Sequence, residues 1–193
     1  MSPALSRAIG VAPVAASTLL QLVMAENLLS QCGKTVEDVT AVAVAAGPGS
    51  FTGVRIGVAA AKGFAWGREI PCFGVSTLEA MALNLGAYQG YVCPCMDARR
   101  SQVYNALFYV NQGQLERISE DRAISLAELG AELKNLKEPI FLVGDGSNLC
   151  YNTLSESVPV LLSASVATTL ATAAWTLATL RRLVFRSIAE TIG

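Results

Sequence analysis

The chain has 193 residues, of which 52% are hydrophobic and 15% charged, and its formal net charge is −1. This length suits one domain or two small ones, and so small a charge excludes a chain that binds nucleic acid mainly by neutralising phosphates. Histidine is absent, which excludes Ser-His-Asp and Cys-His catalysis and any metal site built on imidazole.

The N-terminal segment supports two interpretations. Ile9–Ala25 is largely apolar, follows Arg7 and ends in "VMA", a shape typical of a signal peptide. Its leucines and valines also recur at spacings of three to five, which indicates an amphipathic helix over about Ala16–Gln31, ended by Cys32-Gly33. We favour the helix.

Val36–Thr77 has the pattern of strand, helix, strand and a further helix start. The apolar run "TAVAVAA" predicts a strand buried on both faces. It meets a turn at Gly47–Ser50, and a helix is expected over about Thr52–Trp66. The strand "IPCFGV" follows, and Ser76-Thr77 begins another helix. This order predicts parallel strands joined by a right-handed crossover.

The pattern changes after Gly86–Gly90, which we take as the boundary between domains 1–88 and 89–193. Three antiparallel strands are expected next, with turns at Arg99–Ser101 and Asn111–Gly113. Ser125 then N-caps a charged amphipathic helix, and "PIFLVGDGS" predicts a strand that ends in a Gly-Asp-Gly turn.

Val160–Leu180 is the second segment that imitates a membrane signal. It carries no charge and has the length of a membrane span, about 20 residues. Its high content of Ser, Thr and Ala favours a packed helix over a membrane helix, and we expect no membrane association.

Five cysteines are present, an odd number. Cys32, Cys72 and Cys150 lie far apart in the sequence, and Cys93 and Cys95 form a pair that is too small to hold zinc by itself. A secreted disulfide framework shows an even count, so we expect reduced thiols in a cytosolic core.

The Gly-Pro-Gly-Ser turn leaves two interpretations open. Glycines let a ligand approach the backbone, and free N–H groups at a helix start can hold an anion. The two common phosphate-binding fingerprints do not fit, so a purely structural turn is the alternative. The candidate residues for weak phosphate binding are Gly47, Gly49, Ser50, Thr52 and Gly53.

The helix after this turn is built from small residues over Ile56–Gly63. A helix that is apolar on several faces is buried on several faces. Packing on the sheet alone explains this composition, and so does packing on the sheet with one face and on a partner protein with the other.

Two acidic residues lie at predicted turns. Asp97 precedes Arg99-Arg100, a pattern of solvated turns with ion pairs, and contact with an anion or a partner is the alternative. Asp145 stands between two glycines and is interpreted as a turn residue rather than a metal ligand. The sequence near them supplies no second carboxylate for acid–base chemistry.

The run from Ala41 to Ala82, "AVAVAAGPGSFTGVRIGVAAAKGFAWGREIPCFGVSTLEAMA", resembles the bacterial TsaB family, and "DARRSQVYNALF" and "GDGS" match later motifs of that family. The resemblance covers about Leu28 to Ser147. It implies an α/β fold of the actin-like, ribonuclease-H-like class with two subdomains. It also implies a non-catalytic, cytoplasmic scaffold subunit for forming N6-threonylcarbamoyladenosine in tRNA.

The resemblance further implies the partners. A TsaD-type transferase would bind helices of the N-terminal subdomain, a TsaE-type ATPase would join, and a homodimer through the same helices is the alternative. Contact with tRNA would be indirect, with no catalytic residue, no metal and no cofactor beyond weak ATP or ADP binding at Gly47–Gly53. The implied partner-binding residues are Leu19, Val23, Arg55, Gly57, Ala60 and Phe64.

The chain also differs from the family pattern. Family members open with a strand hairpin that bears an Asp-Thr-Ser turn, and no counterpart precedes Ser17-Thr18, so a truncated N-terminal subdomain is expected. The tail from about Leu162 differs as well. TsaD-like catalysts bind metal through paired histidines, which this chain lacks. An actin-fold ATPase or carbamoyl transferase, a glycoprotease, a membrane-anchored chain and an inactive fragment are the alternatives.

Overall fold

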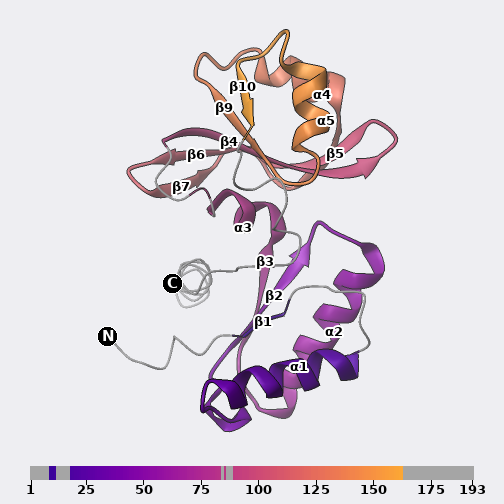
Figure 1. Ribbon diagram of the computed structural model, residues 1–193, viewed down its shortest axis with the longest axis vertical. Coiled ribbons are helices and arrows are strands. Elements are labelled where there is room, and N and C mark those ends of the chain that lie inside the picture. The colour runs from indigo at the N-terminus through magenta and orange to yellow at the C-terminus, as the bar shows by residue number, and fades with distance from the viewer. Residues whose placement is uncertain (1–8, 12–17, 84, 86–88, 163–193) are drawn as a thin grey trace. The chain divides into compact units, whose positions relative to one another are not determined.

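A computed structural model describes residues 9–11, 18–83, 85 and 89–162, and its side chains from Leu22 onward. The described residues divide into two compact units, one ending at Thr77 and the other beginning at Leu78 (Figure 1). Each unit has a sheet and helices of its own.

The first unit is a small parallel sheet with two long helices. The sheet has the order β1-β2-β3, and both neighbours of β2 run parallel to it. Figure 1 shows α1 and α2 side by side on this unit, in agreement with their contacts. The elements are β1 Ile9–Val11, α1 Thr18–Gln31, a short 3₁₀ helix η2 Val36–Asp38, β2 Val42–Gly47, α2 Phe51–Gly67 and β3 Cys72–Ser76.

The core of the first unit lies where β2 meets α2. Val42 and Val44 of β2 pack in one cluster with Ala61 and Ala65 of α2 and with Leu29 of α1. The predicted strand and both predicted helices are therefore confirmed, with the described part of α1 beginning at Thr18. The N-terminal subdomain, expected to be truncated, still has one strand before α1, because β1 pairs with β2 in parallel register.

The second unit contains a mixed sheet of seven strands. β10, β9 and β4 run parallel, whereas β5, β8, β6 and β7 pair in antiparallel fashion. The elements are α3 Thr77–Leu83, β4 Gly90–Arg99, β5 Gln102–Asn105, β6 Phe108–Asn111, β7 Gln114–Arg117, β8 Arg122–Ser125, α4 Leu126–Leu133, β9 Ile140–Val143, α5 Ser147–Leu154 and β10 Val160–Leu162.

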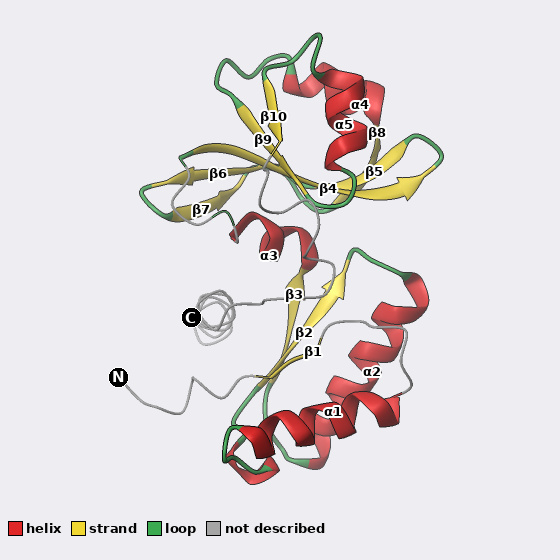
Figure 2. Ribbon diagram, viewed as in Figure 1, coloured by secondary structure: helices red, strands yellow, loops and turns green. Residues whose placement is uncertain are grey.

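Helices pack on both faces of this sheet (Figure 2). Side chains alternate along a strand, so Val92 packs with α3 residues such as Leu78 in one cluster. The next residue, Cys93, packs with α4 and α5 residues such as Leu129 in another cluster. The sheet therefore separates two cores.

The predicted second strand of the antiparallel set is two strands in the structure. β5 and β6 both pair with β4 but are interrupted between Asn105 and Phe108. The interruption lies opposite Pro94, which has no N–H to donate to a ladder. The Asn105 side chain lies there instead, and its Nδ2 donates to Pro94 O at 3.3 Å and to Ala106 O at 3.1 Å.

The Ser125 N-cap is confirmed, and α4 begins at the next residue. Ser125 Oγ accepts the Glu128 N–H at 3.2 Å, and the Glu128 carboxylate accepts the Ser125 N–H, also at 3.2 Å. This reciprocal pair is a capping box. β8 and α5 form without having been predicted.

No helix in the described part of the chain combines the length and apolar composition that a membrane crossing requires. Most of Val160–Leu180 lies outside the described residues, and its described part, Val160–Leu162, forms the strand β10. Within Ile9–Ala25, the described residues form β1 and the first half of α1.

Candidate functional site

The Gly-rich turn connects the end of β2 to the start of α2. Gly47 has a φ of 123°, a conformation open mainly to glycine, and the Gly47–Pro48 peptide bond is cis. A Cβ added at Gly49 would lie 3.2 Å from Val54 Cγ2. Ser50 N-caps α2, and its Oγ accepts the Gly53 N–H at 3.4 Å. The geometry of the turn itself therefore accounts for the two glycines and the serine.

Among the proposed phosphate-binding residues, Gly47, Gly49, Ser50 and Gly53 consequently have local structural roles. Thr52 is exposed and Gly53 is buried. Among the described residues, no group of three or more Cys, Asp or Glu side chains is arranged to hold a metal ion. Weak nucleotide binding at this turn remains a prediction.

Some small residues of α2 face the interior of the first unit, whereas Ala59 and Gly63 are exposed. Gly57 and Ala60 are buried, and Phe64 packs against the core cluster. Gly57 and Ala60 are thus covered within the chain itself, and their contact with a partner stays a prediction. The exposed positions of this helix include Phe51, Arg55, Ala59, Lys62 and Trp66.

Both ends of α2 expose a large aromatic side chain. Phe51 is 72% exposed and Trp66 is 85% exposed. Arg55 lies over the Phe51 ring, with its guanidinium carbon 4.3 Å from the ring centroid. Such stacking leaves a flat apolar and cationic surface at the helix start.

The described side chains of α1 are mostly exposed, although many are apolar. Met24 and Leu28 are 55% and 54% exposed, and Leu29 is the buried side chain of the Leu22–Gln31 stretch. Leu19 lies among the residues whose side chains are not described. We define the α1 apolar surface as Leu22, Val23, Met24 and Leu28.

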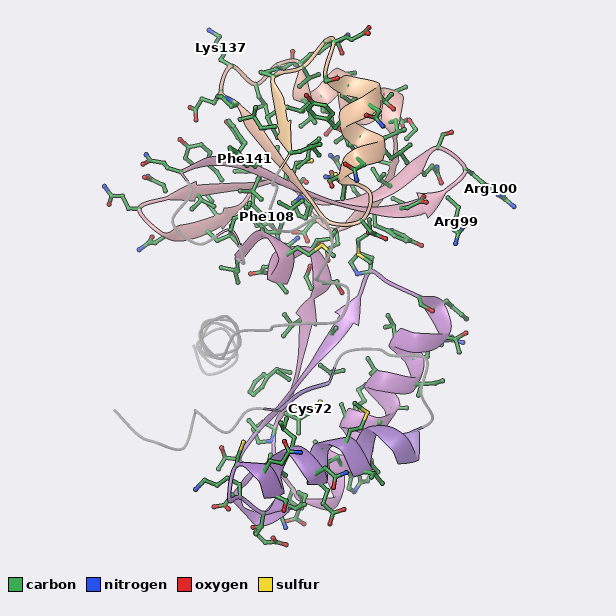
Figure 3. All side chains as sticks on the ribbon, in the orientation of Figure 1. Cys72, Arg99, Arg100, Phe108, Lys137 and Phe141 are labelled. Carbon is green, nitrogen blue, oxygen red and sulfur yellow. The ribbon has the colours of Figure 1, made fainter. Side chains whose placement is uncertain are left out.

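The Asp-Ala-Arg-Arg motif forms the tip of the β4–β5 hairpin. Arg99, Arg100 and Ser101 all have positive φ values, and Asp97 Oδ1 accepts the Arg99 N–H at 2.7 Å. Figure 3 shows the Arg99 and Arg100 side chains extending outward from this tip. The Asp97 carboxylate therefore stabilises the turn.

The Gly-Asp-Gly turn after β9 packs closely on β4. Gly144 has a φ of 101°, and a Cβ there would lie 2.4 Å from Cys95 O. Gly146 donates its N–H to Cys95 O at 3.0 Å. Asp145 between them is exposed. Both glycines are therefore explained by backbone contact.

The five cysteines are free thiols in different environments. Cys32 is exposed and Cys72 is half-buried, so the expectation that the cysteines belong to the core is wrong for Cys32. Cys93, Cys95 and Cys150 are buried together. Hydrogen bonds with Cys150 and Cys93, and burial, raise the pKa of Cys95, whereas the hydrogen bond with Cys95 lowers the pKa of Cys150.

The sequence matches a protein-family model over most of its length. The model is described as "TsaD: tRNA N6-adenosine threonylcarbamoyltransferase", and the match covers residues 3–185. Among curated proteins, the tRNA threonylcarbamoyladenosine biosynthesis protein TsaB of Bacillus subtilis (strain 168) is 41% identical over 123 residues, which is 64% of this chain and 54% of that protein. The chain belongs to the TsaB family, which is related to TsaD.

Two further comparisons agree with the TsaB family. TsaB of Escherichia coli (strain K12) is 37% identical over 128 residues, 65% of this chain and 55% of that protein. A crystal structure from Pseudomonas aeruginosa, titled as a protein with similarity to peptidase YEAZ, is 26% identical with a TM-score of 0.68 over 88% of this chain and 76% of that one. The mixed α/β, actin-like fold class is thereby confirmed.

This TsaB-family chain spans about half the length of the curated relatives it matches. The comparisons identify the family and fold class of the chain.

Two features of these surfaces were missed by reasoning from the sequence. The exposed aromatic residues Phe51 and Trp66 lie at the two ends of α2, and their exposure depends on which face of α2 packs on the sheet, which the sequence does not show. Asn105 was missed because its role depends on Pro94, which is remote in sequence.

Proposed function

We propose that this chain is a non-catalytic scaffold subunit that supports N6-threonylcarbamoyladenosine formation in tRNA by binding a TsaD-type transferase in the cytoplasm. The family membership supports the pathway, since its relatives are named tRNA threonylcarbamoyladenosine biosynthesis proteins. The α1 apolar surface supports the binding role and is the observation that carries it.

The exposed side chains of the first unit fit a protein partner. Large apolar side chains gather on α1, and aromatic residues, which are enriched in interfaces, stand at both ends of α2. Exposed apolar patches of this kind mark interaction sites in soluble proteins. Lys62 and Arg55 add positive charge beside the apolar positions, so an acidic rim on the partner would complement them.

The absence of histidine from the sequence favours a scaffold over a TsaD-type catalyst, because paired histidines hold the metal in such catalysts. A TsaE-type ATPase would join the assembly through the same complex. A homodimer would use the same surface and would compete with the transferase.

The test is co-purification of the full chain with a TsaD-type protein, with and without the double substitution Met24→Glu and Leu28→Glu. Both side chains are more than half exposed, so the variant should fold, and two charges in an apolar interface should weaken binding at least 100-fold. Ile118→Glu is the matched control, since Ile118 is 49% exposed but belongs to the second unit.

Three outcomes would contradict the proposal in different ways. If the unmodified chain fails to bind any TsaD-type protein, the scaffold function is wrong. If the folded double variant binds as tightly as the unmodified chain, the assignment of the α1 apolar surface as the binding site is wrong. If the purified chain by itself transfers the threonylcarbamoyl group, the non-catalytic assignment is wrong.

A further inference from the structure

Three thiols are gathered in the core between the sheet and the helices of the second unit. Cys93 and Cys95 project from the same face of β4, and Cys150 comes from α5. All three are fully buried, and Cys93 Sγ lies 3.6 Å from Cys95 Sγ. A single buried cysteine acts as a small apolar residue, but sulfurs in contact can also react with one another.

Backbone contacts hold Cys150 beside Cys95. Gly146 donates its N–H to Cys95 O at 3.0 Å, and Cys150 donates its N–H to Gly146 O at 3.0 Å. The turn before α5 lies so close to β4 that a Cβ at Gly144 would overlap Cys95 O. The first turn of α5 is therefore fixed over Cys95, and the Cys95 and Cys150 side chains lie in the same buried cluster.

Cys93 is held in a different way. Asn105 donates from Nδ2 to Cys93 Sγ at 3.0 Å, and Arg122 donates from Nη2 to Asn105 Oδ1 at 3.5 Å. Its position along an extended strand, two residues from Cys95, also sets their Cα separation at about 6.6–6.8 Å. This is longer than the usual 5.5–6 Å of a disulfide, so a bridge between these two would distort β4.

We propose that Cys95 and Cys150 form an oxidisable dithiol, which a hydroperoxide converts into a disulfide that ties α5 to β4. The Cys150 thiolate attacks the peroxide, the O–O bond breaks, and a sulfenic acid forms as alcohol or water leaves. The Cys95 sulfur then attacks the Cys150 sulfur, and its proton departs with the released hydroxyl as water. The two thiols lose two electrons, and the peroxide gains them.

The surroundings determine how this pair reacts. The hydrogen bond from Cys95 lowers the pKa of Cys150, which favours Cys150 as the thiolate that reacts first. Burial requires α5 to open transiently before peroxide can enter, so the reaction is slower than at the exposed Cys32. A reducing dithiol reverses it.

The experiment treats the full chain carrying Cys72→Ser with hydrogen peroxide, blocks the remaining thiols and digests with trypsin without reduction. The expected product joins the tryptic peptide of residues 69–99 to that of residues 138–181. It should survive Cys93→Ser and vanish in Cys95→Ser and Cys150→Ser. The bridge should also raise the midpoint of thermal unfolding by several degrees, and dithiothreitol should cancel this rise.

A second measurement guards against a variant that fails to fold. In the unmodified chain, fragmentation of the linked peptides should place the bridge at Cys95 rather than at Cys72 or Cys93. A bridge between Cys93 and Cys95, a link that requires Cys93, or no intramolecular link after Cys32 is fully oxidised would each overturn the proposal.

Discussion

Arg117 joins β7 to α3 through Glu79, with Nη2 lying 3.0 Å from Glu79 Oε2. Both side chains are more than four-fifths buried, at 17% and 13% exposure. The same guanidinium pairs with Asp121 at 2.7 Å and lies over the Phe108 ring, 4.7 Å from its centroid. One buried cation thus connects the helix and the strands on this side of the sheet.

Removing the Glu79 carboxylate should therefore destabilise the second unit. We expect Glu79→Gln to lower the free energy of unfolding by about 1–3 kcal/mol. Arg117 keeps its ion pair with Asp121 but loses a charged hydrogen bond in a largely buried site. Urea unfolding followed by circular dichroism measures this. Glu116→Gln, on the exposed side of the same strand, should stay within about 0.5 kcal/mol, and equal effects from the two would contradict the role of the pair.

Asn105→Ala should destabilise the same unit by about 1–3 kcal/mol. The Asn105 side chain is fully buried, and its loss leaves the Pro94 carbonyl without that donor at the interruption between β5 and β6. Denaturant unfolding of Asn105→Ala and of the exposed-site control Asn148→Ala provides the comparison. A control that costs as much as the buried substitution would show that the effect is not specific to this site.

Gly144→Ala should lower the free energy of unfolding by more than about 3 kcal/mol, because the residue has positive φ and its new Cβ would overlap Cys95 O. Gly63→Ala is the opposite case. It lies within α2, and an added Cβ there meets nothing within 4 Å, so it should stabilise the helix by up to about 1 kcal/mol. The midpoints of thermal unfolding of both variants test this difference. A Gly144→Ala variant as stable as the unmodified chain would contradict the prediction.

Ser125→Ala should remove the N-cap of α4 at a cost of about 1 kcal/mol near neutral pH. Hydrogen bonds from the Ser125 side chain and backbone lower the pKa of Glu128 below its ordinary value. A carboxyl whose pKa is lowered by folding stabilises the fold at pH values above its ordinary pKa, about 4.3 for glutamate. This contribution to stability is lost as the pH falls through the lower pKa of the folded state. The difference between Ser125→Ala and the unmodified chain should therefore shrink in acid, and urea unfolding at several pH values measures it. A difference that grows as pH falls would contradict the capping box.

The alternation of strands and helices around the Gly-rich turn could be predicted because each element there is specified locally. β2 is a continuous apolar run, and α2 begins at a serine cap that follows two glycines. The antiparallel region was predicted less well. The interruption between β5 and β6 depends on Pro94, which lies on another strand, and no feature near Ala106 in the sequence signals it.

The face of α2 that meets the sheet also could not be predicted from the sequence. A helix with small residues on several sides offers little periodicity, so Gly57 and Ala60 were assigned to a partner although they pack inward. The exposed set is recognisable only once Arg55 and Trp66 are placed on the outer side.

Leu29 is the buried side chain of the Leu22–Gln31 stretch of α1, a helix of 14 residues. Isolated helices of this length are marginal in water, so the described stretch of α1, with one buried side chain, gains little stability from the core of the first unit. A molecule that binds the exposed apolar side chains of α1 would stabilise the folded helix by mass action. Amide hydrogens of α1 should therefore exchange faster than those of β2, which hydrogen exchange followed by mass spectrometry measures.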